Sequence, residues 1–326
     1  MGEINLQLQP VPPFRLDLTA WALRRRPDNI IDRWDGECYR RALALGNGAV
    51  EVAITQSGSP QAPRLQVTVS GLGAHPGGGH CRGTACRAPT ADEAIRAAIE
   101  RMLGPRINLA DFYRLAARDR RLGPLAERFR GVKPPRFPSL FEALVNAIAC
   151  QQLSLTVGII LLNRLAQAYG PSPQVEGLCA HAFPRPQELL RAGPQKLRHI
   201  GLSRQKIRSL RELSSYAAEQ RAELDRLERS DDETALAGLL KLRGIGRWSA
   251  EYALLRGMGR LHVFPGDDVG ARNRLARWLG LKAPISYDQV EAALARWQPY
   301  AGLVYFHMLL SGLAEAGYLG HGDSPL

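Results

Sequence analysis

Apolar and polar positions alternate with a period of two in the first part of the chain. Three runs carry this pattern, in which apolar residues are separated by polar or small ones: Leu43 and Leu45; Val50, Val52 and Ile54; Leu65, Val67 and Val69. Asn47-Gly48 and a Ser-, Gly- and Pro-rich stretch at 56–63 separate the runs as turns. Because successive side chains of a strand point to opposite faces, the pattern predicts an antiparallel sheet.

The pattern changes between residues 91 and 103, where apolar side chains recur every three or four positions, as in a helix. Strand signals nearly vanish beyond this point, and we place the main boundary near Gly104-Pro105. We therefore predict an α+β fold. An antiparallel sheet domain with flanking helices would occupy residues 1–104, and a mostly α-helical body would occupy residues 105–326.

The best-marked helix of the body begins after Ser139, which is followed three residues later by Glu142. This spacing is typical of a capping box, in which each side chain binds a free backbone amide at the start of the helix. A turn at 150–154 leads into a second apolar helix, which runs to Tyr169 and stops at Gly170-Pro171. The sequence thus predicts two consecutive core helices joined by a short turn.

Composition and charge narrow the class of protein. Hydrophobic residues make up 45% and charged residues 23% of the 326 positions, which is typical of a globular chain and excludes general disorder. The net charge of +12, from 43 basic and 31 acidic residues, favours a polyanionic partner. No run reaches the roughly 18 apolar residues that span a bilayer, and no secretory leader is visible. Five widely spread cysteines fit reduced thiols, so we expect a cytoplasmic protein, nucleoid-associated if bacterial, that does not bind membranes.

The segment 239–272 carries the most specific signal, and it contains Gly244-Ile245-Gly246. Two glycines around a buried isoleucine allow a tight turn between helices and a close backbone approach to another surface. The amides of Gly244, Gly246 and Arg247 would then lie at a helix N-terminus, where they can bind a phosphate. An ordinary joint between two helices is the alternative interpretation.

This segment resembles the helix-hairpin-helix and Gly/Pro-Asp loop of the DNA glycosylase superfamily that bears the motif's name. Within that superfamily, the chain is most similar to DNA-3-methyladenine glycosylase II, the alkylation-repair branch. Residues 20–41 resemble the start of the family's amino-terminal sheet domain, 137–155 its first core helices, and 295–310 its last helix. The resemblance extends from about Pro12 to about Leu310, with the helix-hairpin-helix at about 236–258 and the catalytic loop at 264–270.

The resemblance implies that Asp268, 22 residues after Gly246, is the catalytic carboxylate. Such a group can stabilise the positive charge that develops on deoxyribose as the N-glycosidic bond breaks, or orient the attacking water. We interpret the adjacent Asp267 as a helix cap or a solvated neighbour. Without the resemblance, an aspartate pair in such a loop would indicate a cap more readily than a catalyst.

The resemblance also assigns the base pocket. Trp248 and Tyr252 are four residues apart and therefore share one face of their helix. In the family, aromatic side chains at these positions stack against an extruded base, and electron-rich rings suit purines made cationic by alkylation. Trp21 is expected to reach the same pocket from the amino-terminal domain. Packing of these aromatics in the core is the alternative.

Further positions are expected to contact DNA. Gln152, with Gln151 beside it, is the candidate for the side chain that fills the hole left by an extruded base, unless the glutamines simply hydrogen-bond their own turn. Arg25 is expected to contact DNA from the amino-terminal domain. Gly244, Gly246 and Arg247 complete the predicted DNA-binding set.

The resemblance implies a subtype as well. Bifunctional relatives carry a nucleophilic lysine at the position of Trp248, and no cysteine follows Cys179 to ligate an iron-sulfur cluster. We therefore expect a monofunctional N-glycosylase that needs no cofactor and no metal. It would act as a monomer on double-stranded DNA containing damaged bases such as 3-methyladenine and 7-methylguanine, in base excision repair.

Two features leave alternatives open. Leu309 stands where the resemblance would place a pocket tryptophan, and Ala301-Gly302 replaces a more polar pair, so the resemblance leaves open a different pocket shape and a different range of bases. His75, His80, Cys81 and Cys86 superficially suggest a metal site, but their spacing matches no standard zinc pattern. A glycosylase for other bases and a catalytically silent DNA-binding protein are the alternative functions.

Overall fold

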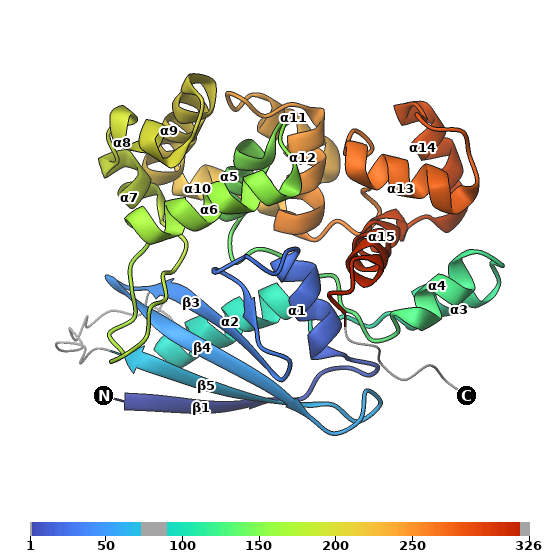
Figure 1. Cartoon of the computed structure of the whole chain (residues 1–326), viewed down its shortest axis with the longest axis horizontal. Helices are drawn as coiled ribbons and strands as arrows, with labels where there is room; N and C mark the ends of the chain where they lie inside the picture. Colours follow the sequence, from blue (N-terminus) through green and yellow to red (C-terminus); the bar gives the residue numbers. More distant parts are fainter. Residues whose placement is uncertain (1, 73–89, 320–326) are drawn as a thin grey trace.

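A five-stranded antiparallel sheet forms the amino-terminal part of the computed structural model, which describes residues 2–72 and 90–319. The strand order is β1-β5-β4-β3-β2 (Figure 1). The strands are β1 (Gly2–Leu8), β2 (Arg33–Trp34), β3 (Cys38–Leu45), β4 (Gly48–Ser57) and β5 (Arg64–Leu72). The three predicted runs form β3, β4 and β5, so the sheet prediction is confirmed. β1 was not predicted, although Ile4, Leu6 and Leu8 alternate with polar residues, and β2 is too short to show a period.

The strand pairing agrees with the predicted antiparallel sheet and its turns. Leu45 lies opposite Gly48 across the β3–β4 turn, and Val52 lies opposite Val69 between β4 and β5. Helices α1 (Leu16–Arg24) and α2 (Ala91–Leu103) share an apolar core with this sheet. Gly104 ends α2 with a φ of 57°, a left-handed conformation that favours glycine, so the predicted end of this helix is confirmed.

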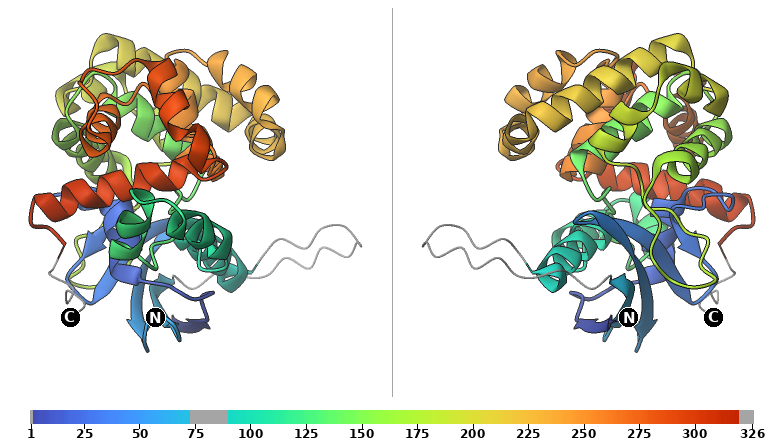
Figure 2. Two further views of the ribbon diagram at one scale, coloured as in Figure 1. Left: turned by 90° about the vertical axis from the view of Figure 1, so that its right-hand side faces the viewer. Right: turned by 90° about the vertical axis from the view of Figure 1, so that its left-hand side faces the viewer.

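A helical body lies against this layer, as Figure 2 shows from two sides. Its helices are α3 (Ala110–Ala117), α4 (Leu122–Arg128), α5 (Leu140–Cys150), α6 (Leu155–Tyr169), α7 (Pro186–Arg191), α8 (Pro194–Ile200), α9 (Arg204–Glu219), α10 (Arg221–Arg229), α11 (Asp232–Leu240), α12 (Arg247–Ala253), α13 (Val269–Leu279), α14 (Tyr287–Leu294) and α15 (Ala301–Glu315). Two apolar cores divide it into two lobes. One lobe contains α5 to α12, and the other contains α3, α4 and α13 to α15 together with part of α1. The predicted α+β architecture is thereby confirmed.

The start of α5 differs from the predicted capping box. The Ser139 side chain accepts a hydrogen bond from the Glu142 amide, as predicted. The Glu142 carboxylate, however, accepts a hydrogen bond from Arg41 of β3 instead of returning to the Ser139 amide. Arg41 also donates to Asp32 at 2.6 Å, and all three side chains are at most 6% exposed. The capping-box glutamate therefore joins the helical body to the sheet.

His307 of α15 is a buried, neutral histidine. Its side chain is fully buried, its Nδ1–H donates to the carbonyl of Leu303 at 2.7 Å, and burial lowers its pKa to about 4. The unfolded chain binds the same proton with a pKa of about 6.5. The contribution of neutral His307 to the free energy of unfolding should therefore be fully present above pH 6.5. As the pH drops from 6.5 towards 4, the free energy of unfolding should fall by up to about 3 kcal/mol, because protonation favours the unfolded chain.

Urea unfolding of the wild type and of His307→Met between pH 7 and pH 4.5 checks this expectation. The difference in unfolding free energy between the two proteins should change across this range, whereas a constant difference would show that His307 does not titrate on unfolding.

Two expectations concern membranes and metals. None of the helices in residues 2–72 and 90–319 is long and apolar enough to cross a bilayer. Within the same ranges, no group of three or more His, Cys, Asp or Glu side chains is arranged to hold a metal ion. The loop with His75, His80, Cys81 and Cys86 lies outside the described residues.

Candidate active site

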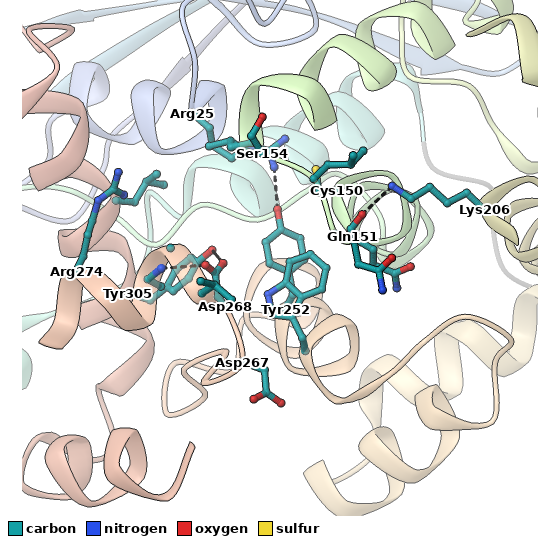
Figure 3. Close-up of a pocket in the computed structure, with 18 of the residues that line it drawn as sticks. Arg25, Cys150, Gln151, Ser154, Lys206, Tyr252, Asp267, Asp268, Arg274 and Tyr305 are labelled. Carbon is teal, nitrogen blue, oxygen red and sulfur yellow. Dashed lines mark hydrogen bonds between the residues drawn. The ribbon is translucent and has the colours of Figure 1, made fainter. Parts of the chain in front are cut away.

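A cavity of about 760 Å³ lies between the two lobes of the helical body (Figure 3). One lobe contributes the α5–α6 turn, the first turns of α9, and α12; the other contributes the start of α13 and one face of α15. Both aromatic residues of α12 and both aspartates of the loop before α13 line it. The structure thus brings Trp248, Tyr252 and Asp268 to a single cavity, although at least 15 residues separate the aromatics from Asp268 in the sequence.

Trp248 and Tyr252 form an aromatic wall of this cavity. Their ring centroids are 5.6 Å apart and their planes are inclined by 33°, as expected for residues one turn apart on α12. The Tyr252 hydroxyl accepts a hydrogen bond from Arg25 at 2.9 Å, and Arg25 also donates to Asn146 at 2.7 Å. The wall is therefore held in place from behind by α5 and by the end of α1.

Asp268 is at once the N-cap of α13 and a group of the cavity wall. Its Oδ1 accepts the Ala271 amide at 2.9 Å, and its Oδ2 accepts the Tyr305 hydroxyl at 3.1 Å. Asp267 points away from it (Figure 3), and its carboxylate lies 3.9 Å from Arg272 with 39% of the side chain exposed. Asp268, not Asp267, is thus the helix cap, and Asp267 is the solvated neighbour.

Tyr305 was not predicted as a site residue. It comes from α15, and burial together with the nearby Asp268 holds the pKa of its phenol well above the usual value. The hydroxyl therefore stays protonated and donates to the carboxylate. No local sequence pattern marks this contact, because it depends on how α15 packs against α13.

A second carboxylate supports the loop that carries Asp268. Glu251 of α12 accepts the Gly266 amide at 3.1 Å and the Tyr287 hydroxyl at 2.7 Å, and burial raises its pKa. The Arg247 guanidinium lies 4.6 Å from the centre of the Tyr287 ring. The helix that carries the aromatic wall therefore also fixes the position of the aspartate loop.

The turn between α11 and α12 contains the two glycines of the predicted tight turn. Gly244 has a φ of 78°, and a Cβ atom at this position would collide with the Ser209 side chain of α9. A Cβ atom at Gly246, the N-cap of α12, would meet nothing within 4 Å, so its backbone is open to an external ligand. Arg247 begins α12 and is exposed. These positions agree with an exposed phosphate-binding turn.

The turn between α5 and α6 forms one edge of the cavity. Gln152 has a left-handed φ of 55° and is exposed, whereas Gln151 donates to the Gly244 carbonyl at 2.6 Å and to Ser249 at 2.8 Å. Gln151 therefore has the structural role that was the alternative to contacting DNA. Leu153, which was not predicted, is 41% exposed beside Gln152 and also lines the cavity.

Lys206 of α9 holds this turn and was also not predicted. Its ammonium donates to the carbonyl of Gln151 at 2.9 Å (Figure 3) and to that of Ala149 at 2.8 Å. These carbonyls lie at the end of α5, where free carbonyl groups and the helix dipole favour a cation. Lys206 thus fixes the α5–α6 turn to α9. Gln151 fixes it to the α11–α12 turn, which is the hairpin of the helix-hairpin-helix motif.

Two predicted amino-terminal residues differ in where the structure places them. Trp21 does not line the cavity; it is 8% exposed and stacks on Tyr318 at 5.9 Å, because its side of α1 packs into the core with α15. Arg25 does line the cavity, where it is 5% exposed and its guanidinium donates to Tyr252 and Asn146, so its contact with DNA stays a prediction.

The positions of α15 at which the sequence differs from the family pattern have different places in the structure. Leu309 lines the cavity, so an aliphatic side chain occupies this part of its wall. Ala301 and Gly302 are buried at the start of the helix and do not line it. The Gly302 amide donates to the Leu261 carbonyl at 2.7 Å, and a Cβ atom there would be too close to that oxygen. Gly302 therefore allows the close packing of α15 against the backbone at Leu261.

Comparison with known proteins gives consistent matches. Residues 145–299 match the model of the HhH-GPD superfamily of base excision DNA repair proteins. DNA-3-methyladenine glycosylase 2 of Escherichia coli is 31% identical over 189 residues, which is 57% of this chain and 63% of its own. DNA-3-methyladenine glycosylase of Bacillus subtilis is 26% identical over 201 residues, 62% of this chain and 66% of its own.

The solved 3-methyladenine DNA-glycosylase from Archaeoglobus fulgidus is similar throughout, with a TM-score of 0.78, 25% sequence identity, and coverage of 97% of this chain and 100% of that one. The sequence matches are shorter: the chain spans about 55–66% of the length of three curated bacterial relatives.

Proposed function

The chain carries a domain of the HhH-GPD superfamily of base excision DNA repair proteins, and on this premise we propose that it is a monofunctional DNA glycosylase for alkylated purines in duplex DNA. One observation carries the proposal: Asp268 and the aromatic pair Trp248–Tyr252 line the same cavity. A binding protein needs no carboxylate facing a base-sized cavity, and a negative charge there would repel the DNA backbone. A monomer suffices, because a single chain supplies every part of the site.

The aromatic wall would receive the base. A purine in a duplex cannot reach a cavity between two helical lobes, so the nucleotide must rotate out of the base stack. An alkylated purine such as 3-methyladenine or 7-methylguanine is cationic and interacts favourably with the electron-rich faces of Trp248 and Tyr252. This preference would separate damaged from normal bases, which are neutral.

Asp268 would act on the sugar. When the N-glycosidic bond breaks, its electron pair leaves with the base, which becomes neutral and needs no general acid. Positive charge develops on the deoxyribose, where the carboxylate stabilises it and orients the water that attacks C1′. The capping amide of Ala271 and the Tyr305 hydroxyl hold the two carboxylate oxygens in place before the base enters.

The hairpin and the α5–α6 turn would hold the DNA. Gly246 and Arg247 are exposed at the start of α12, where the free backbone amides of a helix N-terminus suit a backbone phosphate. Gln152, exposed at the edge of the cavity, would fill the space left by the extruded nucleotide, with Leu153 contacting the neighbouring bases.

The geometry favours hydrolysis without strand cleavage. A lyase step needs an uncharged amine that attacks C1′ to form a Schiff base. Lys206 lines the cavity, but its Nζ donates to the carbonyls of Ala149 and Gln151 and is thereby committed to holding the α5–α6 turn. Trp248 occupies the position at which bifunctional relatives carry the lysine.

A gel assay on end-labelled, methylated duplex DNA tests this function. We expect the protein to generate sites that break only after treatment with alkali, because base removal leaves an intact abasic strand. Strand breaks without alkali would contradict the monofunctional assignment. An absence of alkali-sensitive sites would contradict the proposed activity on alkylated bases.

Trp248→Ala should impair the reaction while leaving the fold intact. Stacking of a base on an aromatic side chain contributes about 1–3 kcal/mol, so kcat/KM on methylated DNA should fall roughly 5- to 150-fold. Trp248 is only partly buried, so the loss of stability should be small by comparison. The control is Trp278→Ala, which removes a partly buried tryptophan of α13 outside the cavity lining. Equal activity losses in the two variants would contradict a stacking role.

A further inference from the structure

A second groove lies on the other side of α9 from the cavity. Gln205, Lys206 and Ser209 line the cavity, whereas Arg204, Arg208 and Arg211 of the same helix line a groove of about 560 Å³ between α8 and α9. Arg198 of α8 also lines it. We call this region, defined by Arg198, Arg204, Arg208 and Arg211, the arginine groove.

Among the residues that the structure describes, none neutralises the positive charge of the arginine groove. The side chains of Arg198, Arg204 and Arg208 are exposed, and none makes a hydrogen bond or ion pair with another residue in the part of the chain that the structure describes. Arg211 donates to the Ala192 carbonyl at 3.0 Å, which leaves its charge unbalanced. Glu212 is the acidic side chain that lines the groove, and its carboxylate already accepts a hydrogen bond from Arg243 at 2.8 Å.

Another surface hollow shows that this imbalance is not a general property of the arginine-rich surface. The hollow between α3 and η2 (Ala295–Trp297) is lined by Arg114, Arg118 and Arg296 together with Asp111 and Asp119. Arg114 forms an ion pair with Asp111, and Arg296 lies 3.7 Å from Asp119. Two of the three arginines there are thus paired with acids, whereas none of the four groove arginines has an acidic partner among the described residues, which favours an external anion.

The place of the groove indicates which anion it binds. It shares α9 with the candidate active site, and the Glu212–Arg243 pair links it to the residue just before the phosphate-binding turn. Arg204 and Arg208 are one helical turn apart on the same face, so they can contact neighbouring groups of a regularly charged polymer. The groove is therefore tied through α9 and the Glu212–Arg243 pair to the elements that would hold DNA.

We propose that the arginine groove binds backbone phosphates of the duplex beyond the nucleotides that the hairpin and the α5–α6 turn contact. This inference rests on the proposed function, because it extends the DNA-binding surface of the same site. Its ligand is the phosphate backbone, so the contact carries no base specificity. It increases affinity for longer DNA and leaves the chemical step unchanged.

The test compares Arg204→Gln/Arg208→Gln with the control Arg64→Gln/Arg120→Gln. Arg64 and Arg120 are exposed residues at the start of β5 and between α3 and α4, away from α8 and α9 (Figure 1). Dissociation constants are measured across a range of salt concentrations on an undamaged duplex of about one helical turn, roughly 10 base pairs, and on one of about three turns. Base release at saturating methylated DNA is measured in parallel.

For the groove variant we expect affinity for the long duplex to fall on the order of 10-fold. The slope of log affinity against log salt should decrease in magnitude by about 2, because two phosphate contacts are lost. Affinity for the short duplex and base release at saturation should match the wild type, and the control variant should be unchanged on both duplexes.

Three results would overturn the proposal. Unchanged affinity of the groove variant for the long duplex would assign the groove to another anionic partner, such as an acidic protein surface. An equal loss on both duplexes would place the arginines within the central footprint, and an equal loss in the control variant would indicate a net-charge effect. None of these depends on base release, so failure of the proposed enzymatic activity remains distinguishable.

Discussion

Asp268→Asn is expected to lower the single-turnover rate of base release roughly 10²- to 10⁴-fold while DNA binding is retained. The substitution removes the negative charge that would stabilise the sugar cation and orient water. Asparagine has nearly the same shape and caps helices about as well as aspartate, so the bond from Oδ1 to the Ala271 amide can persist. The variant therefore separates the charge of Asp268 from its structural role, which Asp268→Ala would not do.

Asp267→Asn is the matched control for this experiment. It makes the same chemical change one residue away, in a side chain that is 39% exposed and points away from Asp268. We expect its rate of base release to stay within a few-fold of the wild type. Substantial activity in Asp268→Asn, or a larger loss in Asp267→Asn, would contradict the assignment of the catalytic carboxylate.

The largest expected effect on stability is that of Arg41→Met. Arg41 is 1% exposed and binds Asp32 of the amino-terminal domain and Glu142 of α5. Asp32 also accepts the Tyr39 hydroxyl at 2.7 Å. Removing the arginine leaves two buried acidic groups without their cation, and breaking a buried ion pair in this way costs about 3–5 kcal/mol.

Urea unfolding at neutral pH measures this loss, and Arg40→Met provides the control. Arg40 is the neighbouring residue on β3 and pairs with Asp35, but both side chains are more than 40% exposed, so their ion pair should contribute at most about 1 kcal/mol. A loss below about 1 kcal/mol in Arg41→Met would show that the buried network does not stabilise the junction of sheet and helices.

Local patterns predict the elements of this fold because each rests on neighbouring residues. The alternation in 43–69 gives the three central strands, and the changed period before Gly104 gives α2. The Ser139 cap follows from spacing, but the use of Glu142 does not, because its partner Arg41 is about 100 residues distant. The family resemblance seen in the sequence is confirmed by the matched domain and by the similarity to solved 3-methyladenine DNA-glycosylase.

The residues of the site show the same difference between local patterns and contacts of distant residues. Trp248, Tyr252 and Asp268 lie in one motif-bearing segment, and the structure places all three at the cavity. The predictions for Trp21 and Arg25 depended on the orientation of α1, which is determined by packing. The tryptophan enters the core, and the arginine donates a hydrogen bond to Tyr252 from behind the aromatic wall. Lys206 and Tyr305 belong to distant helices and could not be assigned from their sequence neighbours.

The decisive measurement is chromatographic identification of the free bases released from methylated duplex DNA. We expect the wild type to release free 3-methyladenine or 7-methylguanine, and Asp268→Asn, while still binding the DNA, to release almost none. A wild type that binds the DNA but releases no methylated purine would contradict the proposed function. Release of hypoxanthine, uracil or oxidised purines in the same assay would then indicate another base specificity, and release of no base at all would indicate a silent DNA-binding protein.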